Sequence, residues 1–76
     1  MNRVGIYPGT FDPITFGHVD IIKKSLKIVD KLVVAISDSS DKDYLFSTDE
    51  RMEILKNSLF KDLKLKKNRI HIVSFE

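Results

Sequence analysis

Apolar and polar residues follow two different periods along this chain. Residues 3–7 and 69–75 alternate between the two kinds, which predicts strands that present one face to a core. Residues 32–36 are an unbroken apolar run, typical of a strand covered on both faces of a parallel sheet. From residue 17 to residue 30, apolar positions recur at spacings of three and four, which indicates an amphipathic helix. We therefore expect helices on both sides of the sheet.

A second helix is predicted by a capping signal and another apolar stripe. Ser47 and Glu50 stand three residues apart, the spacing of a capping box at the start of a helix. The polar residues 37–44 before it predict a loop. The buried face of this helix is expected to carry Met52, Ile54, Leu55, Leu59 and Phe60.

The resulting order of strand, helix, strand, helix, strand predicts an α/β fold with a Rossmann-like parallel sheet and flanking helices. In such sheets, ligands bind outside the carboxyl ends of the strands. The predicted strands make about half of a typical sheet of this class, and no helix follows residues 69–75 to cover the last of them. We expect residues 1–76 to be the N-terminal half of a single domain whose C-terminal half is absent.

Composition narrows the class of protein only slightly. The 76 residues make one domain at most, and the lack of cysteine excludes disulfides and cysteine-based metal sites. The short apolar runs and the first residues fit neither a membrane span nor a signal peptide, so we expect a cytoplasmic protein with no membrane partner. A formal charge of +2 does not indicate a nucleic-acid partner. A basic cluster near the end of the second helix could form a nucleic-acid patch, but cations at a helix C-terminus complement the dipole and need no ligand. The cluster consists of Lys61, Lys64, Lys66, Lys67 and Arg69.

Candidate chemistry gathers in residues 8–18, between the first strand and the first helix. This segment has neither the Gly-Lys-Ser/Thr of a P-loop nor the closely spaced glycines of a dinucleotide-binding turn. His18, in the first helical turn, would hold an imidazole beside main-chain N–H groups, where negative charge on phosphorus is stabilised. Taken singly, each residue also has a structural explanation: a surface histidine at His18, capping by Thr10 and Thr15, and a turn at Asp12.

The segment as a whole resembles a known family. Residues 7–15 read Tyr-Pro-Gly-Thr-Phe-Asp-Pro-Ile-Thr, and residues 15–18 read Thr-Phe-Gly-His. Together they are similar to the N-terminal motif of the bacterial phosphopantetheine adenylyltransferases, members of the nucleotidyltransferase superfamily. The resemblance spans nearly the whole chain and continues at Ala35, Ile36, Lys42, Phe46, Glu50 and Arg51.

The resemblance implies an enzyme that joins ATP and 4′-phosphopantetheine into dephospho-CoA and pyrophosphate, with Mg²⁺ and no covalent enzyme intermediate. By the same resemblance His18 is catalytic: it stabilises the transition state and contacts the ATP phosphates. Thr10 touches both substrates, and Phe11 offers its main-chain N–H to ATP. Thr15 and Gly17 shape the entry to the helix at the ATP site. No residue of this chain is expected to bind a metal directly.

Lys42 follows the second strand and by resemblance binds the phosphate of the acceptor substrate. Its alternative is a solvated loop lysine between two acids. The family usually continues with a second lysine and a proline, whereas this chain has Asp43 and Tyr44. Family segments rich in arginine and serine, which complete the ATP site, have no counterpart among these residues. We therefore expect the 76 residues alone to be inactive.

Two other classes of function remain open at this stage. One is a different nucleotidyltransferase, either a cytidylyltransferase or a nicotinamide-nucleotide adenylyltransferase. The other is a non-catalytic binding or assembly fragment, in which exposed strand edges pair with another chain. Open edges also lead us to expect a homo-oligomer.

Overall fold

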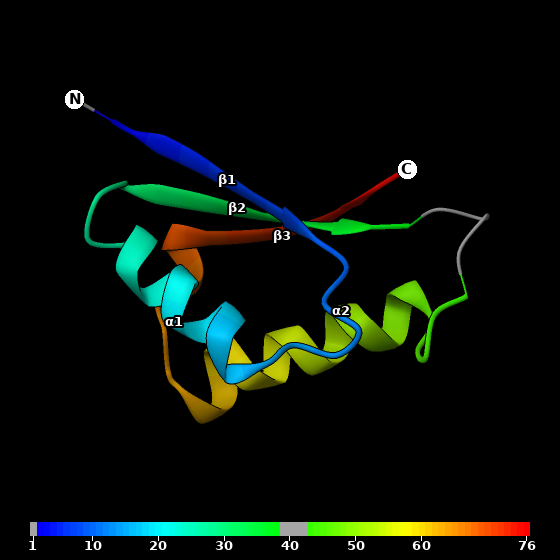
Figure 1. Cartoon of the computed structure of the whole chain (residues 1–76). Coiled ribbons are helices and arrows are strands. Elements are labelled where there is room, and N and C mark those ends of the chain that lie inside the picture. Colours follow the sequence, from blue (N-terminus) through cyan, green and yellow to red (C-terminus); the bar gives the residue numbers. More distant parts are fainter. Residues whose placement is uncertain (1, 39–42) are drawn as a thin grey trace.

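The computed structural model describes residues 2–38 and 43–76. Within these residues, helical segments cover one face of a three-stranded sheet (Figure 1). No helix in these two ranges is both long and apolar enough to cross a membrane. The elements, in chain order, are β1 (Val4–Gly9), α1 (Phe16–Ser25), β2 (Lys31–Ser37), α2 (Thr48–Lys56), the π-helix η1 (Asn57–Asp62), the 3-10 helix η2 (Lys67–Arg69) and β3 (Ile70–Phe75).

The sheet confirms the predicted parallel α/β architecture. Its strands lie in the order β1-β2-β3, and both neighbouring pairs are parallel. One row across the sheet joins Ile6, Val33 and His71. Because all three strands run the same way, their carboxyl ends meet at one edge, where the loops after β1 and β2 begin.

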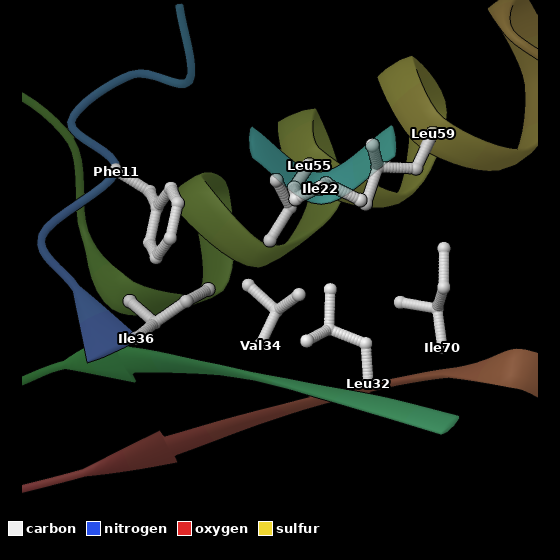
Figure 2. Packing of buried hydrophobic residues seen from close by; sticks show 8 residues of the cluster. All are labelled: Phe11, Ile22, Leu32, Val34, Ile36, Leu55, Leu59 and Ile70. Carbon is white, nitrogen blue, oxygen red and sulfur yellow. The ribbon is translucent and has the colours of Figure 1, made fainter. Parts of the chain in front are cut away.

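The core lies between the sheet and the helices (Figure 2). Leu32, Val34 and Ile36 of β2 point toward the helices, and all three are buried. The side chains that meet this row and complete the buried cluster are Phe11, Ile22, Leu55, Leu59 and Ile70. The predicted stripe of the second helix is thereby confirmed at Leu55 and Leu59.

The expectation of helices on both sides of the sheet is wrong for the described residues. Both α1 and α2 cover the same face (Figure 1). The physical reason is that crossovers between parallel strands are right-handed, so successive helices share a face when the chain steps in one direction across the sheet. The opposite face exposes 42% to 70% of each of the apolar side chains Val4, Ile6, Val73 and Phe75.

The first helix is shorter than its apolar pattern predicted. It ends at Ser25, and the chain then turns through residues 26–29 with a mixture of i to i+3 and i to i+4 hydrogen bonds. Arg69 binds this turn: it donates to the carbonyl oxygens of Leu26, Val29 and Asp30 at 2.6, 2.9 and 3.1 Å. Leu26 and Val29 of this turn still pack on the core, which explains why the sequence pattern continues beyond the helix, whereas Ile28 is exposed.

Candidate active site

The loop between β1 and α1 folds over its own phenylalanine. Phe11 is 1% exposed, and its side chain points into the core beside Ile36 (Figure 2). Its backbone has a φ of 50°, a left-handed conformation that costs energy for a residue with a side chain. Gly9 permits this arrangement, because a Cβ there would lie 2.9 Å from the Phe11 ring. The loop is therefore held by a buried aromatic anchor.

His18 is held by the cap of its own helix. The Thr15 N–H donates to Nδ1 of His18 at 2.9 Å, while the Thr15 Oγ1 accepts from the His18 N–H at 3.4 Å. The Thr15 Oγ1 also lies 3.1 Å from Nδ1. This is a capping box in which histidine takes the place of the usual Glu or Gln. Because a backbone N–H must donate, Nδ1 is the acceptor and the neutral ring carries its proton on Nε2.

The imidazole packs on the buried anchor. The ring centroids of His18 and Phe11 are 4.8 Å apart, and Tyr7 meets Phe11 edge-on at 5.3 Å. The first turn of α1 contains no acidic residue, so the positive end of its dipole is not neutralised by a side chain there. A fixed Nε2–H donor and the exposed N–H groups of a helix start together favour a phosphate.

The remaining residues of the motif lie around this histidine. Thr10 is half-buried at the end of β1, and Thr15 caps α1 as one of the structural explanations anticipated. A Cβ at Gly17 would meet only the Thr15 Oγ1, at 3.6 Å, so the described residues leave room for a side chain there. Lys42 lies outside the described residues. Across residues 2–38 and 43–76, no group of three or more His, Cys, Asp or Glu side chains could hold a metal ion.

Asp12, whose sequence context predicts only a turn, helps to hold together the loops around the candidate site. Its carboxylate accepts hydrogen bonds from the N–H groups of Leu45 and Phe46, at 2.5 and 2.9 Å. These residues belong to the loop before α2, more than thirty positions away along the chain. The carboxylate therefore ties the loop after β1 to the loop after β2.

Arg51 is the second residue that the sequence analysis missed as part of the site. It is 1% exposed, and no buried side-chain nitrogen or oxygen in the described residues lacks a hydrogen bond. Its guanidinium donates to the carbonyl oxygens of Thr10, Ser37 and Phe46, at 2.9, 2.7 and 3.2 Å. A signal was present in the sequence: Arg51 stands four positions before Leu55, on the stripe predicted to be buried.

The fold and this loop define a class of protein. The sequence pattern of the cytidylyltransferase-like family matches residues 6–73, and the chain belongs to that family. A more particular similarity is to curated proteins named phosphopantetheine adenylyltransferase. The one from Pelagibacter ubique is 53% identical over 75 residues, which are 99% of this chain and 46% of the relative. The one from Francisella philomiragia is 49% identical over 76 residues, 100% of this chain and 44% of the relative.

The chain thus spans about half the length of the curated relatives it matches. Among solved structures, it resembles a bifunctional NMN adenylyltransferase/ADP-ribose pyrophosphatase from Francisella tularensis, crystallised with AMP and a manganese ion. The TM-score is 0.84 over 97% of this chain and 22% of that one, at 19% identity. At that identity the likeness supports the fold and not a shared substrate.

Proposed function

We propose that the protein to which these residues belong transfers AMP from ATP to 4′-phosphopantetheine, which yields dephospho-CoA and pyrophosphate. Residues 1–76 would supply the N-terminal half of the nucleotidyltransferase domain. The observation that carries this proposal is the position of the His18 imidazole. Thr15 fixes the ring at the start of α1 with its proton on Nε2. The similarity to curated phosphopantetheine adenylyltransferases over the whole chain supports this substrate pair above the alternatives.

The proposed reaction is an in-line displacement. A phosphate oxygen of 4′-phosphopantetheine attacks the α-phosphorus of ATP, and the bond from that phosphorus to the pyrophosphate oxygen breaks. Negative charge builds on the non-bridging oxygens, where the Nε2–H of His18 and the N-terminus of α1 would stabilise it. Thr10 and the Phe11 N–H would orient the substrates, so most of the rate would come from position and electrostatics.

Mg²⁺ would arrive with ATP as part of the substrate. This ion keeps several water ligands and is commonly held by substrate phosphates with few protein groups. Its contribution would be to neutralise phosphate charge. We also propose that the protein works in the cytoplasm as a homo-oligomer, with open strand edges as candidate contacts between copies.

The experiment that tests this function uses a completed protein: residues 1–76 joined to the part of the Pelagibacter ubique relative that follows its matched region. Dephospho-CoA and pyrophosphate are measured with Mg²⁺, ATP and 4′-phosphopantetheine. Parallel reactions replace ATP with CTP, or the acceptor with nicotinamide mononucleotide. Equal formation of dephospho-CoA and pyrophosphate supports the proposal. A completed protein that folds and transfers nucleotide only to a different acceptor contradicts it.

Lys42→Ala in the completed protein is expected to weaken binding of 4′-phosphopantetheine and to leave ATP binding nearly intact. Loss of a charged hydrogen bond to the acceptor phosphate predicts an increase in Kd of about 10- to 100-fold. Calorimetry with each substrate separately measures both values. Lys61→Ala, in η1, is the matched control and should change neither affinity by more than about twofold. A larger effect on ATP than on the acceptor would refute the assignment of Lys42.

A further inference from the structure

Arg51 joins the two loops at the carboxyl edge of the sheet through one buried group. Its guanidinium contacts the end of β1 at Thr10, the end of β2 at Ser37, and the loop before α2 at Phe46. The Thr48 Oγ1 accepts a further hydrogen bond at 3.1 Å. An apolar side chain would fill a buried position at lower desolvation cost, so the presence of arginine calls for a role beyond packing.

The contact with Thr10 controls the direction of a neighbouring N–H group. The Thr10 carbonyl and the Phe11 N–H belong to one planar trans peptide, in which the two groups point in opposite directions. Because the Thr10 oxygen accepts from the Arg51 Nη1 at 2.9 Å, the Phe11 N–H must point away from the guanidinium. Rotation of this peptide would leave a buried cationic donor without its acceptor.

The other end of the peptide is fixed as well. Phe11 is anchored by its buried ring and adopts the positive φ described above. With the ring held on one side and the Thr10 oxygen on the other, the peptide plane between them has one orientation. We propose that Arg51 is a positioning residue that aims the Phe11 N–H at ATP, an inference that rests on the proposed function.

The surroundings of the guanidinium strengthen its hold on the loop. The ring of Tyr44 covers Arg51, with 3.9 Å from the guanidinium carbon to the ring centroid. Asp38 Oδ1 lies 3.9 Å from the Arg51 Nη2 and adds a negative charge beside it. Removal from water makes the hydrogen bond to Thr10 stronger than the same bond at the surface. The family usually has proline at the position of Tyr44. The contact between the Tyr44 ring and the Arg51 guanidinium is therefore a feature of the present sequence.

Arg51→Lys in the completed protein tests the inference. Lysine keeps the charge but cannot serve several carbonyl oxygens with one planar fork. The KM for ATP is expected to rise about tenfold or more, with less than about a threefold change in the KM for 4′-phosphopantetheine. In a ¹⁵N-labelled sample, the Phe11 amide signal should also shift between the wild-type protein and the variant.

Arg69→Lys is the matched control. Arg69 also donates to three backbone carbonyls, but at the opposite end of the sheet. This variant is expected to lower the melting temperature while both KM values stay within about twofold of wild type. Equal effects of the two substitutions on the KM for ATP would overturn the inference, because Arg51 would then act only on stability.

Two further measurements distinguish failure of this inference from failure of the proposed function. If Arg51→Lys does not fold, MgATP is titrated into the labelled wild-type protein: a shift of the Phe11 amide supports the inference, and an unmoved amide at saturating ATP overturns it. If the wild-type protein makes no dephospho-CoA, the proposed function fails. The Phe11 amide signal of Arg51→Lys then decides whether Arg51 orients the peptide: an unchanged signal overturns that role, and a shifted one supports it.

Discussion

His18→Ala in the completed protein is expected to lower kcat by about 10²- to 10³-fold, the usual cost of one donor that stabilises developing negative charge. The KM for ATP should change much less, because the contact strengthens as charge builds on the α-phosphate. Pyrophosphate release at saturating concentrations of both substrates measures this effect. An unchanged kcat would refute the assignment of His18 as the catalytic residue.

His18→Gln separates catalysis from the capping of α1. Glutamine is a usual residue at this position of a capping box, and its side-chain oxygen can accept from the Thr15 N–H in place of Nδ1. The glutamine variant should therefore recover the melting temperature lost in the alanine variant. Its kcat should remain low, since the amide N–H groups of glutamine do not lie where the imidazole ring of His18 holds its Nε2–H. Recovery of both quantities would mean that His18 serves mainly as a cap.

Residues 1–76, prepared alone, are expected to self-associate and to form no dephospho-CoA above background. The sheet face opposite the helices exposes apolar side chains, and Ile6 is 70% exposed there. Within the described ranges β1 and β3 each pair on one side only, so their other edges offer unpaired backbone groups. Burial of these surfaces between copies is favourable. Sedimentation velocity measures the association, and chromatography of reaction mixtures measures the product.

A matched pair of substitutions identifies the associating surface. Ile6→Glu places a charge on the uncovered sheet face and should shift the chain toward the monomer. Leu45→Glu places the same charge on an 80% exposed side chain of the loop before α2, and should leave association unchanged. A wild-type chain that sediments as a compact, cooperatively melting monomer, or that makes dephospho-CoA, would contradict the prediction.

The periodicity of the sequence was sufficient to predict the order of the elements. Alternation and apolar runs identified the three strands, and the Ser47–Glu50 capping box is confirmed by reciprocal hydrogen bonds of 3.2 Å at the start of α2. These signals act over a few neighbouring residues, so they are readable without tertiary contacts. The motif in residues 15–18 likewise predicted a site at the carboxyl edge of the sheet. Its residue roles remain predictions.

Only the tertiary structure decided how distant residues share that edge. The Asp-Pro pair at residues 12–13 predicts only a turn, yet the Asp12 carboxylate binds the loop before α2. The local pattern indicates no role for Arg51 at the site, yet this side chain binds the carbonyl oxygens of Thr10 and Ser37. The apolar run of β2 predicts helices on both faces of the sheet, yet α1 and α2 cover one face. Each of these outcomes depends on strand order and on contacts across many residues, which a local pattern does not encode.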